Sequence, residues 1–233
     1  MPGPDPRDRF TSSFSFGRPK KTSQPAAPRP APQAPPQRQQ APAPASPSSA
    51  APAQERVSVR LWAGASKGTL AVAFTDIVAS AALTLKLGNR EMDALRRRHF
   101  AWAVELVARH GGCVVKTIGD SVMAVFRAAA DAMDFALAVH ADPGDKRIQV
   151  RAGVHVGPVT IEEGDVYGAT VNYAARVVAS AAGAEVRLSS EAKSHVEQEG
   201  DPRHAVLRWQ AQRDLELKGF PGKQILWAVA RSQ

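Results

Sequence analysis

The pattern of apolar and polar positions in residues 57–233 changes between two periods, which predict strands alternating with helices. Residues 70–77 are continuously apolar up to Thr75-Asp76, which is typical of a strand buried on both faces. Residues 147–156 alternate strictly, and one side of this predicted strand is apolar throughout: Ile148, Val150, Ala152, Val154 and Val156. We expect Gly157-Pro158 to end this strand and residues 159–161 to return as a short partner strand.

Apolar residues at helical spacing predict the helices. The first begins with Asn89 as its N-cap and ends at Gly111-Gly112. Its buried side is marked by residues three or four apart: Met92, Leu95, His99, Trp102 and Leu106. Further helices are predicted over residues 128–141, 169–182 and 190–199. Additional strands are predicted over residues 184–188, 208–217 and 224–229.

A two-residue connection, Gly119-Asp120, separates two apolar runs in residues 113–126. Glycine at the first position of such a turn tolerates a positive φ, so the segment predicts a tight β-hairpin. Asp120 then lies at the tip of the hairpin, and Lys116 lies on the incoming strand.

The predicted order of elements is β-α-β-β-α-β, followed by C-terminal additions. This is the ferredoxin-like arrangement, an α+β fold in which the helices lie on one side of an antiparallel sheet. We expect one domain over residues 57–233, preceded by a segment of a different kind.

Residues 1–56 hold fourteen of the eighteen prolines, together with many Ala, Gln and Ser residues and no apolar period. They predict a disordered tail with polyproline II character. The tail carries eight Lys/Arg and three Asp/Glu, a net +5 out of +8 for the whole chain. Because these charges are scattered, they favour a solubilising linker over a nucleic-acid-binding surface. A partner for the tail stays an open alternative.

The single cysteine, Cys113, excludes an intrachain disulfide and a zinc site of several cysteines. Its apolar surroundings predict a buried small side chain. No apolar run reaches the length that spans a bilayer, and the N-terminus lacks the apolar stretch of a secretory signal. We expect a soluble, cytoplasmic protein.

Two carboxylates, Asp76 and Asp120, each lie at the tip of a strand, and the two strands should be neighbours in one sheet. Like charges at close range raise each other's pKa, so their convergence indicates a bound divalent cation. Mg²⁺ is held by one or two carboxylates plus substrate phosphate oxygens, and paired metals support in-line displacement at phosphorus. The backbone amides of residues 77–80 could receive phosphate oxygens.

A second polar group surrounds residues 165–176. Asn172 and Arg176 are four residues apart and share one helix face, where an amide and a guanidinium suit a sugar and a phosphoryl group. Asp165 precedes this helix in a Gly-bounded turn. With Lys116 it makes an acceptor and a donor, which fits the pairing edge of adenine better than that of guanine.

Each of these residues has an ordinary structural explanation when taken singly. Asp165 could be a turn residue, Asn172 a helix-start cap, Arg176 a solvated arginine and Lys116 a strand lysine that reaches water. The functional interpretation depends on the whole set, because six ordinary explanations together are much less probable than any one of them, given where the six residues fall.

Five segments resemble the catalytic domain of class III nucleotidyl cyclases, in the adenylate cyclase branch. They occur in the family's order and cover about two-thirds of the chain: FTDIVAS (74–80), KTIGDSVMAVF (116–126), RAGVHVGPV (151–159), DVYGATVNYAAR (165–176) and LKGFPGK (217–223).

The resemblance implies an adenylate cyclase that converts ATP to 3′,5′-cyclic AMP and pyrophosphate. It implies two Mg²⁺ or Mn²⁺ ions per active site, bound by Asp76 and Asp120, with Ile77 at the same metal site. It also implies that Lys116 and Asp165 recognise adenine and that Asn172 orients the ribose. By the same resemblance, Arg176 would stabilise the transition state, and Arg151 and Lys218 would bind the triphosphate. Each active site of the family lies between two catalytic domains, so a head-to-tail homodimer is implied.

One departure is Ala79, where many relatives have glycine; alanine is small, and we expect it to be tolerated. Three alternatives stay open. The first is a guanylate cyclase. The second is a catalytically silent cyclase-like domain that senses nucleotides or dimerises. The third is a nucleic-acid-binding protein acting through its basic tail.

Overall fold

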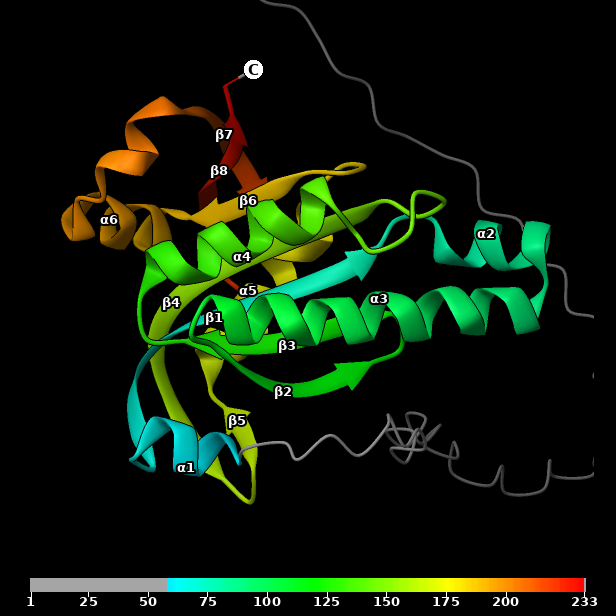
Figure 1. Ribbon diagram of the computed structural model, residues 1–233. Helices are drawn as coiled ribbons and strands as arrows, with labels where there is room; N and C mark the ends of the chain where they lie inside the picture. The colour runs from blue at the N-terminus through cyan, green and yellow to red at the C-terminus, as the bar shows by residue number, and fades with distance from the viewer. Residues whose placement is uncertain (1–57, 233) are drawn as a thin grey trace, which may run out of the picture. The chain divides into compact units, whose positions relative to one another are not determined.

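The computed structural model describes residues 58–232, in which eight strands form one sheet (Figure 1). The prediction of a disordered tail over residues 1–56 lies outside the described residues. The strand order is β2-β3-β1-β4-β6-β8-β7, and β5 pairs with β4. The strands are β1 Lys67–Ile77, β2 Cys113–Ile118, β3 Ser121–Phe126, β4 Val150–Glu162, β5 Asp165–Tyr167, β6 Val186–Ser189, β7 Leu207–Glu216 and β8 Lys223–Arg231.

The predicted ferredoxin-like core is confirmed by the order β2-β3-β1-β4 of its four strands. Helices α3 (Asn89–Arg109) and α4 (Ala129–Ala141) connect these strands and lie on one face of the sheet (Figure 1). The sheet is not purely antiparallel, because the added strand β6 runs parallel to β4. Helix α5 (Ala169–Ser180) covers the opposite face, where it packs on β4 and β1.

Strand β1 contributes to both hydrophobic cores, as its continuous apolar run predicts. Ala71, Ala73 and Ile77 belong to the core under α3 and α4, whereas Val72 and Phe74 belong to the core under α5. Helix α5 comes very close to the sheet: a Cβ added at Gly153 would lie 2.4 Å from the backbone nitrogen of Val178. Any larger residue at this position would push α5 away from the sheet.

Strand β4 runs without a break from Val150 to Glu162, so the predicted end at Gly157-Pro158 is wrong. Pro158 is exposed, and its carbonyl accepts a hydrogen bond from Thr170 Oγ1 (2.6 Å) rather than from a strand. The proline therefore faces a gap in the ladder between β6 and β5, where its missing N–H costs no strand hydrogen bond. The partner of the end of β4 is β5, and Asp165 is its first residue.

The helices differ from the prediction in one N-cap and in two additional helices. Asn89 is the first residue of α3, its side chain makes no cap hydrogen bond, and Gly88 takes the N-cap position, so the predicted cap is wrong. Two helices were not predicted, α1 (Val59–Ala63) and α2 (Ser80–Leu87). Helix α1 is five residues long, and α2 buries no residue, so neither produces a clear apolar period.

The C-terminal part contains helix α6 (Ser190–Glu199) and the short 3-10 helix η1 (Pro202–Val206). Ser189 caps α6 by accepting a hydrogen bond from the Ala192 amide. Glu199, at the other end of α6, accepts hydrogen bonds from the amides of Ala129 (2.8 Å) and Ala130 (2.7 Å). A carboxylate thus caps the positive end of α4 from a different helix. Among the helices of residues 58–232, none has the length and apolar character needed to cross a bilayer.

Ala79 adopts the left-handed backbone conformation (φ 52°, ψ 36°) directly before α2. We expect Ala79→Gly to raise the free energy of unfolding by about 0.5–1 kcal/mol, because glycine has no Cβ to strain at positive φ. The melting temperature should rise by roughly 2–4 °C per kcal/mol for a domain of this size. The control, Ala82→Gly inside α2, should instead lower stability by about 1 kcal/mol. A decrease in both variants would contradict the assignment of strain to Ala79.

Three histidines, His99, His110 and His155, have a pKa below the usual value, chiefly because burial disfavours their charged form. The unfolded chain binds protons near pH 6.5 that the folded chain does not. The free energy of unfolding should therefore fall as the pH decreases through about 6.5, by at most about 1.4 kcal/mol per pH unit for each histidine.

Melting curves between pH 7.5 and pH 5.5 measure this slope. His155→Gln should reduce the slope, whereas Gln198→Ala, which removes no titrating group from an exposed position of α6, should leave it unchanged. Equal slopes in all three proteins would mean that His155 titrates normally.

Candidate functional site

The pairing of β1 with β3 brings Asp76 and Asp120 together at one end of the sheet. The ladder runs from Ala71 opposite Phe126 to Thr75 opposite Val122, so Asp76 follows beside Ser121. Ser121 Oγ donates a hydrogen bond to Asp76 Oδ1 (3.0 Å). Asp120 is the preceding residue, in the two-residue turn that Gly119 opens with φ 58°. The predicted hairpin and the predicted neighbourhood of the two strands that carry the carboxylates are therefore confirmed.

Each carboxylate also has an arginine partner from another element. Arg151, opposite Asp76 in the β1–β4 ladder, places Nε at 3.0 Å and Nη2 at 2.6 Å from Asp76 Oδ2. Its Nη1 donates to the carbonyl of Ala181 (3.1 Å). Arg96 of α3 places Nε at 2.8 Å from Asp120 Oδ1. The two negative charges are thus balanced by two guanidinium groups within the chain.

The oxygen donors at this end of the sheet fit Mg²⁺ or Mn²⁺, which prefer carboxylate oxygens. In residues 58–232, no group of three or more His, Cys, Asp or Glu side chains could hold a metal ion. A metal held by Asp76 and Asp120 would therefore need further oxygens from outside this set, as a nucleotide phosphate provides. The side chain of Ile77 is 2% exposed and lies in the core, so only its backbone carbonyl could contribute.

Lys116 and Asp165 meet as an ion pair, with Nζ 2.5 Å from Oδ2. A β-bulge in β2 directs Lys116 to this place, because the register with β3 shifts between Val114 and Lys116. Val114 pairs with Ala124 of the α3/α4 core, whereas Lys116 pairs with Met123 of the α5 core. If β2 alternated strictly through Val115, Lys116 would share the face of Val114 and point to the α3/α4 core.

Asn172 and Arg176 lie together on the exposed side of α5, as their spacing predicts. The opposite side of the helix is buried and includes Tyr173, whose ring packs against that of His155 at a tilt of 32°, with 4.3 Å between centroids. Within residues 58–232, no hydrogen bond or ion pair links Asn172 or Arg176 to the carboxylates or to Lys116. A single chain therefore exposes these two side chains to solvent without bonding them to the other polar residues of the set.

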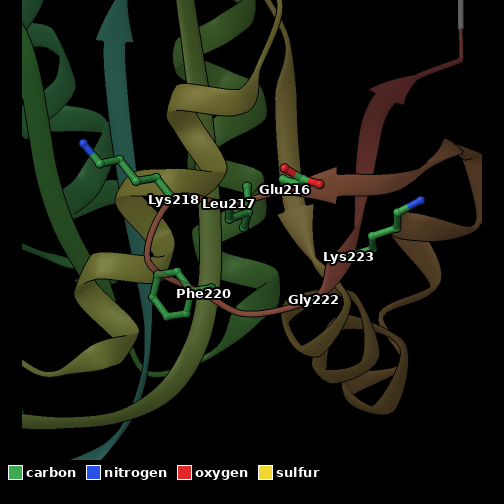
Figure 2. Close-up of a pocket in the computed structure, with 6 residues that line it drawn as sticks. All are labelled: Glu216, Leu217, Lys218, Phe220, Gly222 and Lys223. Atoms are coloured by element: carbon green, nitrogen blue, oxygen red, sulfur yellow. The ribbon is translucent and has the colours of Figure 1, made fainter. Parts of the chain in front are cut away.

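Lys218 lies in the loop between β7 and β8. This loop and the adjoining strand ends line a cavity of about 450 Å³, whose lining residues are Glu216, Leu217, Lys218, Phe220, Gly222 and Lys223. Figure 2 shows Lys218 and Lys223 pointing away from each other, while Phe220 lies beneath the loop. Phe220 packs edge-on against Tyr173, with 4.8 Å between ring centroids. This contact fixes the loop, and with it Lys218, to α5.

The segment after Asp76 fulfils only part of its expected role as an amide donor. The Val78 amide donates to the carbonyl of Gln149 (2.9 Å) and is already used. Helix α2 then begins at Ser80, and the amides in the first turn of a helix have no partner inside it. Phosphate oxygens could therefore be received at the start of α2 but not at Val78.

Sequence reasoning missed two residues that contact the carboxylates, Arg96 and Ser121. Arg96 belongs to a run of three arginines, and nothing in the sequence distinguishes it from Arg97 or Arg98. Ser121 follows Asp120 directly and looks like an ordinary strand start. Only the spatial arrangement of α3 and β3 identifies them.

A family model described as "Adenylate and Guanylate cyclase catalytic domain" matches residues 64–231. An adenylate cyclase of Streptomyces coelicolor is 37% identical over 114 residues, covering 48% of this chain and 30% of that protein. An uncharacterised protein of Mycobacterium tuberculosis is 34% identical over 159 residues, covering 65% of this chain and 39% of that protein. The match therefore spans well under half the length of these two curated relatives.

Solved structures with the same fold include both kinds of cyclase. The adenylyl cyclase CyaB from P. aeruginosa superposes with a TM-score of 0.61 at 20% identity, covering 72% of this chain and 96% of that one. The guanylate cyclase domain of RhGC from Catenaria anguillulae, in complex with GTP, gives a TM-score of 0.61 at 22% identity, covering 72% and 100%. At these identities the likeness establishes the fold alone.

Proposed function

The chain belongs to the family of adenylate and guanylate cyclase catalytic domains, and from this we propose that it converts ATP into 3′,5′-cyclic AMP and pyrophosphate. In this reaction the ribose 3′-oxygen loses its proton and forms a bond to the α-phosphorus. The bond from that phosphorus to the pyrophosphate oxygen breaks.

The observation that carries the choice of ATP is the ion pair of Lys116 with Asp165. Lys116 has three donor hydrogens and Asp165 has spare lone pairs, so each retains capacity for a ligand. Lysine can donate to the acceptor ring nitrogen of adenine, and aspartate can accept from its exocyclic amino group. Guanine offers a donor ring nitrogen and an acceptor oxygen at this edge, so the same pair would meet it with the wrong pattern.

Asp76 and Asp120 would hold two divalent cations, Mg²⁺ or Mn²⁺, with nucleotide phosphate oxygens completing the coordination. When bound, the metals lower the pKa of the attacking hydroxyl and stabilise charge on the phosphate oxygens. Ser121 orients Asp76 by its hydrogen bond to Oδ1.

The remaining residues of the site bind and position the nucleotide. Arg151 and Lys218 would bind the triphosphate, Asn172 would orient the ribose, and Arg176 would stabilise the charge that grows on the α-phosphate oxygens. These groups need not move a proton. Their contribution is positioning and charge stabilisation, which dominate phosphoryl transfer.

The complete site would form between two copies of this chain. Asn172 and Arg176 point outward from α5, so a second chain can bring them to the carboxylates of the first. All six polar positions are present in one sequence. A symmetric homodimer would therefore contain two equivalent sites.

Purified protein incubated with ATP and Mn²⁺ or Mg²⁺ should release cyclic AMP and pyrophosphate, which chromatography of the products measures. Asp120→Ala should lower the rate by roughly a hundredfold or more, because one metal-binding carboxylate is lost. Competition between ATP and GTP tests the choice of base. Formation of cyclic GMP in preference to cyclic AMP would favour a guanylate cyclase, and pyrophosphate without any cyclic nucleotide would refute the proposal.

Mixing Lys116→Ala chains with Asp120→Ala chains should restore activity that each variant lacks alone. In a mixed dimer one site receives intact carboxylates from one chain and an intact Lys116 from the other, so about a quarter of the wild-type activity should return. The control mixes Lys116→Ala with Asp165→Ala, which damage the same half of each site and should show no rescue. Absence of rescue in the first mixture, with mixed dimers demonstrated, would mean that the sites are not shared.

A further inference from the structure

Arg96 is a residue of α3 that contacts Asp120, the carboxylate at the tip of the β2–β3 hairpin. Its Nε lies 2.8 Å from Asp120 Oδ1, and the two side chains are 33% and 22% exposed. A second ion pair joins Arg96 Nη2 to Asp93 Oδ1 at 3.1 Å, one turn earlier in α3. The guanidinium is therefore held by two carboxylates, only one of which belongs to the candidate metal site.

The contact with Asp120 is one of charge rather than a well-directed hydrogen bond. Arg96 Nε is buried and, among the described residues, has no acceptor in hydrogen-bond geometry. The neighbouring His99 is completely buried, and burial lowers its pKa. Arg96 is the group that compensates the charge of Asp120 from the α3 side.

We propose that Arg96 sets the metal affinity of the site by occupying Asp120 while no metal is bound. This inference rests on the proposed function, because it takes Asp120 to be a metal ligand. A group that binds the free carboxylate competes with any ion that binds the same carboxylate, so the arginine weakens metal binding by mass action. The guanidinium also repels a divalent cation placed a few ångströms away.

Arg151 makes the equivalent contact with Asp76, but its position differs in one respect. Arg151 lies on β4 opposite Asp76 and is itself proposed to bind the triphosphate. A bound triphosphate can therefore attract Arg151 away from Asp76. Arg96 comes from α3, on the other face of the sheet (Figure 1), so it stays beside Asp120 in either case.

The consequence is that the metal ion alone should bind weakly, and that binding should improve when the negative triphosphate offsets Arg96. Removing Arg96 should strengthen the binding of the metal alone. The expected change is roughly two- to fivefold, because a partly exposed ion pair makes a modest contribution. Arg96 is a positioning residue in this scheme, since it acts through Asp120 and does not touch the nucleotide.

The test is a titration of the full chain with Mn²⁺ in the absence of nucleotide. The electron paramagnetic resonance signal of free Mn²⁺ measures how much of the ion remains unbound. Arg96→Ala should bind Mn²⁺ two- to fivefold more tightly than wild type, and Arg96→Lys, which keeps the charge, should stay close to wild type. The matched control is Arg97→Ala, which removes the same charge from the next, exposed position of α3. If Arg96→Ala does not fold by circular dichroism, Arg96→Gln replaces it.

Asp120→Asn separates the two proposals. If Asp120→Asn does not weaken Mn²⁺ binding, Asp120 is not a metal ligand and the proposed function fails together with this inference. If Asp120→Asn weakens binding but Arg96→Ala leaves it unchanged or weaker, the inference alone is overturned. Tighter binding in Arg97→Ala by the same factor would also overturn it, because the effect would then come from net charge.

Discussion

The position of strand β1 between β3 and β4 is the constraint on which the candidate site depends. Asp76, near the carboxyl end of β1, lies beside Ser121 of β3 and opposite Arg151 of β4. Side chains alternate between the two faces of a strand, so a slip of one residue would move Asp76 to the α3/α4 face. The alternating packing of Ala71 and Ala73 against one core, and of Val72 against the other, fixes this register. Hydrophobic packing along β1 therefore determines where its carboxylate lies.

Charge balance is the second organising feature. Asp76 is paired with Arg151, Asp120 with Arg96, and Asp165 with Lys116, each partner coming from a different strand or helix. Partly exposed pairs of this kind add little to stability. Their importance is that each of these carboxylates has a positive neighbour within the chain, whether it lies at the start of β4, as Asp76 does, or beside its far end, as Asp165 does.

Much of the fold could be predicted from the sequence, because the apolar periods of β1, α3, α4 and β4 are long and regular. The Gly119-Asp120 turn and the shared face of Asn172 and Arg176 follow from local rules, and both predictions are confirmed. The roles of the site residues remain predictions. The path of β4 through Pro158 could not be predicted, because it depends on a gap between β6 and β5 that only the assembled sheet creates. Arg96 could not be singled out, since its partner is distant in sequence.

The bulge at Val115 has a consequence for how related sequences are compared. The bulge places Val115 and Lys116 together on the α5 side of β2, opposite Met123. A relative that lacked Val115 would have a regular ladder, and its lysine would still follow Val114 and lie on the α5 face. A one-residue gap at this point of an alignment is therefore compatible with an unchanged ion pair to Asp165. A strand of the same length that alternated strictly would instead turn the lysine into the apolar core under α3 and α4, without any substitution of the lysine itself.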